Sequence, residues 1–481
     1  MVGIKSYGAY IPRYRINHNT IFSAVGFLGT FPPPGENAVA NHDEDTLSMA
    51  VAAGVDCLNG VKREEIDGLY LATTSQPYML RQNSAIVAAA LDLQNSIRTA
   101  DFLGSNKSGT SALLSAFDAV KGDTSTNVLV CASDCRVSKP GSSQEPLYGD
   151  AAAAVLMGGS DDVIATLEGH FSVSYDFPDR WKTTGEKFEH TWEDRFIRDA
   201  GYAKIIPEAI SGLLKKYNLA ITDFTKIAFP DLYPREHAAI VKRLGADPRQ
   251  IQTSLLGKIG DTGSASSLMM LVAALEDAKP GDKIMIASFG NGSDAMFFQV
   301  TENIKKMGTR RGVKKNLETK KELASYEKYL AFRNLMPVEL GMRGEIGFRT
   351  PMSTLFRERE TVLALCGSKC KRCGTPQYPP QRICVNPDCG AVDQMEGYRF
   401  SDKKGVLFTY TGDNLAASID PPAIYGFVDF DGGGRFWFDI TDCDLDSTKV
   451  GMPVEMTFRR RYVDESGGVY GYSWKAMPVR A

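Results

Sequence analysis

The chain has 481 residues, a length that predicts two to four domains with room for large buried cores. Hydrophobic residues make up 43% of it and charged residues 23%, which is typical of a folded globular protein and excludes a wholly disordered chain or a coiled coil. Its 55 basic and 58 acidic residues nearly cancel, so the net charge creates no field that would gather nucleic acid or an anionic membrane.

The first residues, 1–16, alternate polar and apolar side chains up to a proline, which predicts a strand rather than a signal peptide. No apolar run in the chain approaches the roughly 18 to 20 residues of a membrane span. Nine cysteines are an odd number, and four of them lie in one short cluster, so we expect no disulfide framework. The sequence therefore favours a reducing cytoplasm.

The first 300 residues repeat one pattern twice. A helical segment at 107–123 leads to the apolar run 127–133, and another at 262–282 leads to 283–288. Upstream, each half carries a further strand and helix. Both helical segments place apolar residues at i, i+3, i+4 and i+7, namely Leu113, Ala116, Phe117 and Val120 in the first and Leu268, Leu271, Val272 and Leu275 in the second. The repetition predicts a duplicated α/β fold with parallel strands covered by helices.

Changes of pattern along the chain predict its domains. We expect the first half of the duplication over 1–165, the second over 166–300, a charged linker over 301–343, a helix and zinc ribbon over 344–395, and a barrel over 396–481. Residues 301–330 carry nine Lys and Arg against four Glu, which indicates a solvated arm, and we assign it no function. In the last segment, short alternating stretches between turn residues predict a small antiparallel β-barrel, with strands at 405–412, 424–431, 435–441, 453–463 and 470–477.

Four cysteines form two pairs with the spacing of a metal site. Cys370 and Cys373 are separated by two residues, and Cys384 and Cys389 by four. Four thiolates on two tight turns suit tetrahedral zinc and leave no open coordination position, so we predict a structural zinc ion. Cys366 lies just before the cluster, and we expect an ordinary thiol there.

Several segments together resemble hydroxymethylglutaryl-CoA synthase of the archaeal type, within the thiolase superfamily: "LYLATTSQPYMLRQNSAIVAAAL", "ADFLGSNKSGTSALLSAF", "GKIGDTGSASSLMML" and "SFGNGSDAMFFQV". The resemblance covers roughly Met1 to Arg343. The remainder resembles the zinc-ribbon and OB-fold domain that accompanies acyl-CoA thiolases and synthases. What the resemblance implies is a layered αβαβα fold, a homodimer, a coenzyme A thioester as substrate, and the making or breaking of a C–C bond beside that thioester.

The same resemblance implies a cysteine acylated at a helix N-terminus, a glutamate as general acid/base, and a histidine that orients the second thioester. In this sequence those positions hold Asn106, Thr74 and, near the third, Pro230 or Asp231. An asparagine of the family's second-half motif becomes Asp261. Since an amide can neither ionise to a nucleophile nor release an acyl group, we expect no acyl-enzyme at Asn106.

Few residues could act as nucleophile in place of the missing cysteine. Ser105 neighbours Asn106 but should point elsewhere on a tight turn, and no histidine lies nearby in sequence to activate it. Cys131 lies inside an apolar run and Cys135 just past it, so both are expected to be core or loop thiols.

Enolate chemistry needs no acyl-enzyme, because an amide N–H near a helix N-terminus can hydrogen-bond a thioester oxygen as charge develops. Asn106 suits that task. Asp231, Tyr233 and Asp261 are the candidate proton acceptors, and we favour one of the aspartates, with a pKa raised toward neutrality by burial. Asp261 is an equally good cap for the helix that follows it, so both roles stay open.

Further candidates lie in loops. His190 is in a polar insertion with the composition of a flap over the site. It is the preferred functional histidine of the five, although an ordinary surface histidine is the commoner case. Thr74, Gly290, Gly292 and Ser293 are expected to line the substrate. The last three lie in a segment that resembles the family's glycine loop beside the thioester, where missing side chains admit ligand close to the backbone. A role in the turn alone is an equally good interpretation of these glycines. Arg459 to Arg461 lie on a late barrel strand, where they could contact nucleotide phosphate. Alternation would place them on both faces of the strand, so we favour a solvated edge.

Three functions remain open. The first is an enzyme that makes or breaks a C–C bond of an acyl-CoA without a cysteine acyl-enzyme, and we favour it. The second is a catalytically quiet scaffold that supplies the zinc and barrel domain to a thiolase partner chain. The third is single-stranded nucleic-acid binding by the barrel, which the near-neutral charge disfavours.

Overall fold

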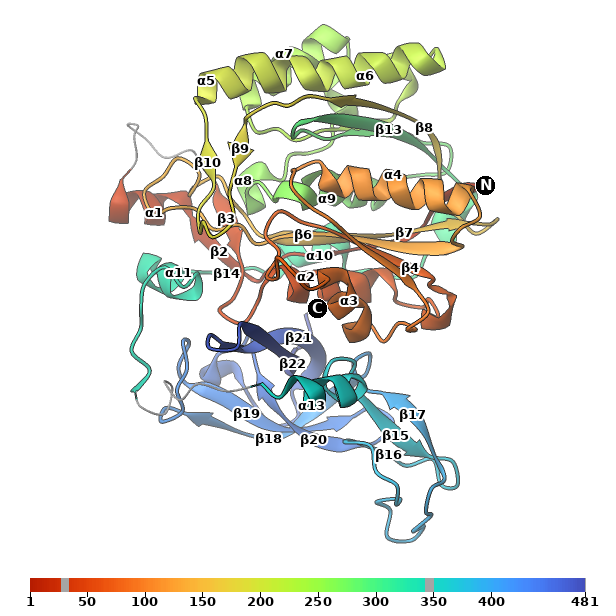
Figure 1. Ribbon diagram of the computed structural model, residues 1–481, viewed down its shortest axis with the longest axis vertical. Helices are drawn as coiled ribbons and strands as arrows, with labels where there is room; N and C mark the ends of the chain where they lie inside the picture. The colour runs from red at the N-terminus through yellow and green to blue at the C-terminus, as the bar shows by residue number, and fades with distance from the viewer. Residues whose placement is uncertain (27–33, 342–349, 481) are drawn as a thin grey trace.

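The structure is a computed structural model that describes residues 1–26, 34–341 and 350–480. Helices and strands alternate in five layers, and a β-barrel with a projecting ribbon lies beneath them (Figure 1). The predicted duplicated α/β fold followed by a barrel is confirmed. The linker and ribbon segments expected over 301–343 and 344–395 fall partly on 342–349, outside the described residues. Among the residues that are described, no helix has the length and apolarity needed to cross a membrane.

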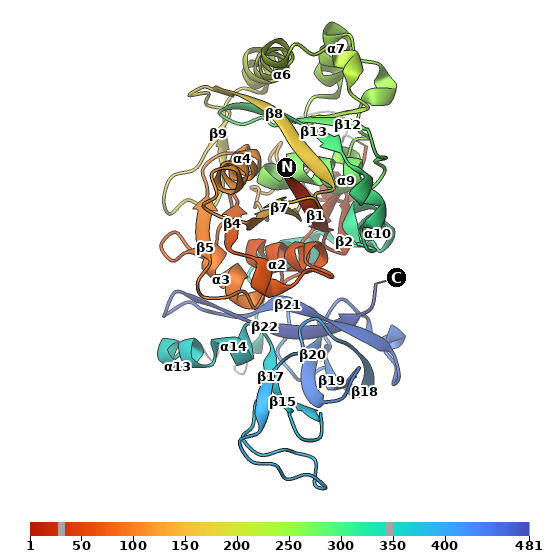
Figure 2. The same cartoon turned by 90° about the vertical axis from the view of Figure 1, so that its right-hand side faces the viewer.

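One nine-stranded sheet forms both β-layers, with its strands in the order β11-β12-β13-β8-β1-β7-β6-β4-β5. Its strands are β1 (Val2–Tyr10), β4 (Gly68–Ala72), β5 (Arg98–Phe102), β6 (Asn127–Asp134), β7 (Ala151–Gly159), β8 (Ala165–Ser174), β11 (Lys226–Ala228), β12 (Lys283–Ala287) and β13 (Gly292–Val300). Only Gly3 and Ile4 of β1 pair with β8, so the sheet bends there into two layers (Figure 2). A Cβ on Gly3 would lie 2.1 Å from the Ala165 carbonyl oxygen, which explains the glycine.

Two helices fill the space between the sheet layers, and others cover the outside. The central pair is α4 (Ser108–Lys121) and α9 (Ser266–Leu275), and the outer helices include α2 (Thr46–Cys57) and α3 (Asn83–Ala90) on one face and α6 (Ala203–Tyr217) and α7 (Pro234–Leu244) on the other (Figure 1). All eight apolar positions predicted for α4 and α9 are buried. The parallel pairs β4–β6 and β11–β12 repeat the same relation, which confirms the duplication.

The charged segment after residue 300 packs against the body, so the prediction of a solvated arm was wrong. Helix α10 (Gly312–Glu318) packs on β1, and β14 (Lys321–Glu322) extends a small sheet formed with β2 (Tyr14–Asn17) and β3 (Glu36–Val39). Helix α11 (Tyr326–Phe332) buries Tyr326, Tyr329 and Phe332 against that sheet and α1 (His18–Val25). Three buried aromatic rings in seven residues hold this segment in place, whatever its charge.

The C-terminal part is a closed five-stranded barrel in the order β18-β19-β20-β22-β21, as predicted. Its strands are β18 (Lys404–Asp413), β19 (Ala423–Phe430), β20 (Arg435–Ile440), β21 (Pro453–Asp464) and β22 (Val469–Pro478). The ribbon consists of β15 (Cys366–Cys370), β16 (Pro376–Gln377) and β17 (Met395–Arg399), and short helices α13 (Met352–Arg357) and α14 (Arg359–Val362) precede it.

Strands β21 and β22 hold the barrel against the body. Arg459 is fully buried and forms ion pairs with Asp43 at 3.0 Å, Glu44 at 2.8 Å and Asp442 at 2.7 Å. The predicted solvated edge was therefore wrong for Arg459, because two of its partners come from the loop before α2. One apolar cluster also continues from α2 and α3 into the barrel interior. The two parts therefore share an apolar core and a charged seam, which consists of Arg459, Asp43, Glu44 and Asp442.

Candidate functional site

The two halves of the duplication meet where α4 begins. Asn106 lies two residues before Ser108, the first residue of that helix, and faces the backbone of Gly290. A Cβ on Gly290 would lie 3.0 Å from the Asn106 nitrogen, and its φ of +154° also favours glycine. Ser105 Oγ donates a hydrogen bond of 2.7 Å to the Gly290 carbonyl. The start of α4 and the glycine loop are therefore in contact, and the Ser105 hydroxyl is held by a hydrogen bond within that contact.

The rest of the glycine loop enters strand β13. Gly292 pairs with Ser174, and Ser293 is fully buried within the sheet. The next residue, Asp294, is 2% exposed and accepts hydrogen bonds from Lys107 Nζ at 3.2 Å and Thr110 Oγ1 at 2.8 Å. Within this loop, the backbone of Gly290 is the part shown to lie against Asn106.

A buried carboxylate organises the Thr74 side of the site. Asp134, at the end of β6, is completely buried and accepts hydrogen bonds from the Thr74 nitrogen at 2.7 Å and its hydroxyl at 3.0 Å. It also accepts from Ser75 Oγ at 2.8 Å and from the Ser264 nitrogen of the second half at 2.7 Å. Sequence reasoning missed Asp134. The available signal was an acidic residue two positions after the apolar run 128–132.

Asp261 is held by two arginines. Its Oδ2 lies 2.9 Å from Arg136 and 3.0 Å from Arg180, and its Oδ1 accepts a hydrogen bond of 3.1 Å from the Gly263 nitrogen at the start of the following turn. Burial by itself would raise the pKa of Asp261, but Arg136 and then Arg180 lower it to about 2. The expected upward shift is therefore wrong for this aspartate, which stays ionised as a fixed negative charge.

The other predicted proton acceptors lie close by. Asp231 and Asp261 line the same small cavity of about 10 Å³, roughly the room of one water molecule. Tyr233 immediately precedes α7, and its hydroxyl donates a hydrogen bond of 3.0 Å to Asp194. Burial, followed by the Asp194 charge, raises the pKa of Tyr233. Asp231 is thus the predicted acceptor that shares a cavity with Asp261.

The polar insertion forms a two-stranded hairpin, β9 (Arg180–Trp181) and β10 (His190–Thr191). Arg180 and Glu189 attach it to the body, because Arg180 pairs with Asp261 and Glu189 accepts a hydrogen bond of 2.6 Å from the Tyr148 hydroxyl. His190 is exposed, and it contacts the ring of Trp181 and, at 2.7 Å, Glu186. Since both partners belong to the hairpin, the structure does not bring His190 to the Asp261 group.

Neither Cys131 nor Cys135 is activated as a nucleophile. Burial raises the pKa of Cys131, which is completely buried in β6, and that of Cys135 just beyond it. Cys135 accepts a hydrogen bond of 3.1 Å from Arg333. Because the thiolate is the reactive form, both thiols are weak nucleophiles at neutral pH, as the sequence predicted.

The four clustered cysteines come together in the ribbon. Their sulfur atoms lie within 4.8 Å of one another, with Cys370 and Cys389 at 3.8 Å and Cys373 and Cys384 at 3.5 Å. A tetrahedral ion with Zn–S bonds of about 2.3 Å separates its sulfur ligands by about 3.8 Å. The donor set and its spacing fit zinc, and Cys366 lies outside the group.

The α/β part of the chain is similar in sequence to known enzymes. It is 33% identical over 320 residues to hydroxymethylglutaryl-CoA synthase of Methanopyrus kandleri, covering 64% of this chain and 89% of the relative. The enzyme of the same name from Thermococcus gammatolerans is 31% identical over 338 residues, covering 69% and 94%. Residues 214–298 match the family model for the C-terminal part of 3-oxoacyl-[acyl-carrier-protein] synthase III.

Solved structures share the fold of the α/β part, and a second family model matches the C-terminal part. A crystal structure of HMG-CoA synthase complexed with CoA is 21% identical, covers 73% of this chain and 94% of its own, and gives a TM-score of 0.62. The β-ketoacyl-[acyl carrier protein] synthase III of Thermus thermophilus, 18% identical, covers 63% and 99% with a TM-score of 0.56. Residues 398–459 match the model described as ChsH2, C-terminal OB-fold domain. The chain thus belongs to the hydroxymethylglutaryl-CoA synthase family and carries an OB-fold domain at its C-terminal end.

Proposed function

We propose that this protein is an enzyme that makes or breaks a C–C bond next to the thioester of an acyl-CoA, by aldol or Claisen-type chemistry without a cysteine acyl-enzyme. The observation that carries the proposal is Asn106 at the start of α4, against the Gly290 backbone, at the position where the family resemblance implies the acylated cysteine. An amide in that place can donate a hydrogen bond to a thioester oxygen but cannot form a thioester.

We assign the roles from the chemistry and charge of each group. The Asn106 side-chain N–H and the N-terminal end of α4 stabilise negative charge on the thioester oxygen as an enolate forms. Asp231 accepts the α-proton in the aldol direction. Asp261, ionised and held by Arg136 and Arg180, does not compete for that proton and instead fixes the hairpin over the site.

A second candidate is the catalytically quiet subunit of a thiolase complex. The small cavity at Asp231 and Asp261, about 10 Å³, favours it, because an acyl group does not fit there unless side chains move. Under this alternative the barrel and ribbon serve a partner chain.

Exchange of deuterium into the methyl group of acetyl-CoA tests enolate formation without knowledge of the second substrate. The protein is incubated with acetyl-CoA in deuterium oxide, and the label is followed by mass spectrometry. We expect exchange with the wild type and its loss in Asn106→Ala and Asp231→Asn. Asn95→Ala and Asp446→Asn, both at exposed positions, serve as matched controls that keep the exchange.

Absence of exchange, together with gain of activity in a thiolase chain that co-purifies with the protein, favours the scaffold instead. A mass increase of one acetyl group on the chain contradicts the proposed mechanism directly.

The remaining assignments extend the proposal. The four clustered thiolates hold a structural zinc ion. The protein forms a homodimer through the outer edge of β5, which among the described strands pairs only with β4. The neighbouring loop, where Leu80 is 95% exposed, belongs to the same interface. None of the nine cysteines is in a disulfide bond, which suits the reducing cytoplasm. Light scattering of the purified protein measures the dimer.

A further inference from the structure

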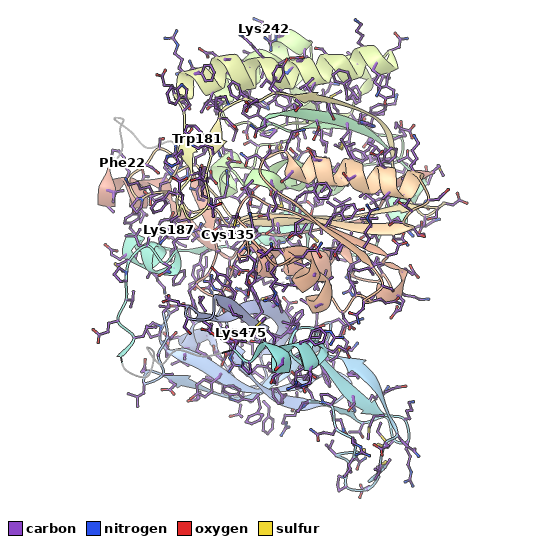
Figure 3. All side chains as sticks on the ribbon, in the orientation of Figure 1. Phe22, Cys135, Trp181, Lys187, Lys242 and Lys475 are labelled. Atoms are coloured by element: carbon purple, nitrogen blue, oxygen red, sulfur yellow. The ribbon has the colours of Figure 1, made fainter. Side chains whose placement is uncertain are left out.

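A cavity of about 320 Å³ lies where the body, the hairpin and the barrel meet. It adjoins the proposed reaction site, because Ser75 and Arg136 line it and both belong to the hydrogen-bonded groups around Asp134 and Asp261. Figure 3 marks Cys135 and Lys187, which line it from the end of β6 and from the hairpin. The barrel contributes Arg460 and Tyr470.

Two buried arginines at this cavity have donors to spare. Arg136 is 2% exposed and Arg333 7%, and each already pairs with a carboxylate, Asp261 and Asp150 respectively. Within the described residues, Nε and Nη1 of Arg136 and Nε of Arg333 still have no hydrogen-bond partner. These nitrogens are themselves buried, and the Arg136 guanidinium lies 4.1 Å from the centre of the Tyr148 ring, so a ligand oxygen in the cavity pairs with them only if its wall moves.

The rim of the cavity is positively charged. In the part of the chain that the structure describes, no carboxylate forms an ion pair with Lys182, Lys187 or Arg460. Lys187 donates to the carbonyl of Asn334 at 2.6 Å, and Arg460 to that of His42 at 2.8 Å, and neither acceptor carries a charge.

The carboxylates of the same cavity have partners. Glu189 accepts from the Tyr148 hydroxyl, Glu44 pairs with Arg459, and Asp45 caps helix α2 and accepts from Tyr472. By the same measure Glu189 and Asp45 have neutral partners only, so three cations and two carboxylates lack an ion pair and the rim keeps one positive charge in excess.

From these contacts we infer that the cavity binds an oxyanion of the ligand, and that the fused barrel completes this site through Arg460. The inference rests on the proposed function for the identity of the ligand, an acyl-CoA. Two parts of such a ligand carry the required chemistry: the phosphates of coenzyme A and a carboxylate on the acyl group. Arg and Lys bind either group by charge-assisted hydrogen bonds.

A second cavity adjoins the first and extends the proposed binding site. It has a volume of about 630 Å³, shares Pro77, Phe332, Asn334, Arg460 and Tyr470 with the first, and continues along the β21–β22 hairpin. Arg460 therefore lies at the point where both cavities meet, so a long ligand that occupies both passes its guanidinium group.

Calorimetric titration of the full chain with coenzyme A, pantetheine and glutarate tests the inference. We expect Arg460→Gln and Lys187→Gln to weaken oxyanion binding about tenfold or more, the effect of losing one charged hydrogen bond. Arg461→Gln is the control for the barrel, since Arg461 is exposed at a bulge on the same strand. Lys242→Gln on α7, at the far end of the molecule, is the control for lysine (Figure 3).

The two sources of the oxyanion give different results. A loss confined to coenzyme A, with pantetheine unaffected, assigns the site to phosphate, whereas a loss confined to glutarate assigns it to a carboxylate. If neither anion binds, or if the Arg460 and Lys187 variants bind both as tightly as their controls do, the inference is overturned.

Failure of the inference and failure of the proposed function remain distinct. Deuterium exchange that proceeds while Arg460→Gln binds normally removes only the oxyanion site. Binding that depends on Arg460 without any exchange removes only the enzyme. Because Lys187 is exposed, its variant keeps the test valid even if a barrel variant folds poorly.

Discussion

Arg459 of barrel strand β21 and Asp43 of the loop before α2 form an ion pair of 3.0 Å in which neither side chain is more than 2% exposed. Asp43 also pairs with Lys475 at 3.0 Å, and its carbonyl accepts a hydrogen bond of 2.8 Å from the Arg460 nitrogen. A buried pair of this kind is costly to break, because the remaining charge is left without a partner.

Arg459→Met is therefore expected to lower the free energy of unfolding by about 3 to 5 kcal/mol and to loosen the barrel. Urea denaturation measures the first effect, and limited proteolysis of the segment before the barrel measures the second. Arg461→Met, two residues along and exposed, should change stability little. Equal stability of the two variants would show that the seam contributes nothing.

Asp261→Asn removes the charge that holds Arg136 and Arg180. Both arginines are largely buried, so we expect a loss of about 3 to 5 kcal/mol and faster hydrogen exchange in the β9–β10 hairpin. The comparison is Asp277→Asn, which breaks an exposed pair with Lys314 and should cost less than about 1 kcal/mol. An unchanged exchange rate in the hairpin argues against Asp261 as its anchor.

Glu276 gives the stability a pH dependence of known sign. Burial raises its pKa from 4.5 to about 7, against the opposing effect of hydrogen bonds from the Val313 and Lys314 nitrogens. The folded chain then holds this proton more tightly than the unfolded chain, so the contribution of Glu276 to stability falls as the pH rises from its ordinary pKa to about 7.

Glu276→Gln should accordingly flatten the fall in the urea midpoint between pH 5 and 7, with Glu318→Gln, at an exposed position, as the control. A variant slope equal to that of the wild type shows that Glu276 titrates normally.

Metal analysis of the purified chain should find one zinc ion per molecule. Cys373→Ser is expected to lose it, because three thiolates bind zinc less tightly than four, whereas Cys366→Ser should keep it. Removal of the metal by a chelator should expose the ribbon to protease and leave the nine-stranded sheet intact. Retention of zinc by the Cys373 variant would contradict the four-cysteine site.

The sequence predicted those parts of the fold that show strong local periodicity. The apolar spacing around Leu113 and Leu268 identified the two central helices, and alternating residues identified all five barrel strands. Strand β5 was missed because Arg98–Phe102 contains no continuous apolar run. The arm was misread because its charge was weighed above Tyr326, Tyr329 and Phe332, whose spacing of three residues indicates one buried helix face.

The candidate site was only partly predictable, because its charges are balanced by residues far apart in the chain. Asp231 and Asp261 were expected near each other and do line one cavity. The pKa of Asp261 was expected to rise, yet Arg136 and Arg180, which come 125 and 81 residues earlier, lower it. Alternation along β21 likewise could not reveal that Arg459 meets Asp43, since no local pattern records a partner in another domain.

The bulge on β21 gives three consecutive arginines three different surroundings: Arg459 in the seam, Arg460 at the cavity and Arg461 in solvent. An insertion or deletion of one residue in this strand would exchange those surroundings at once. A change in the length of β21 would therefore disturb both the attachment of the barrel to the α/β part and the binding of ligand at Arg460. The two properties thus depend on the same strand length and change together.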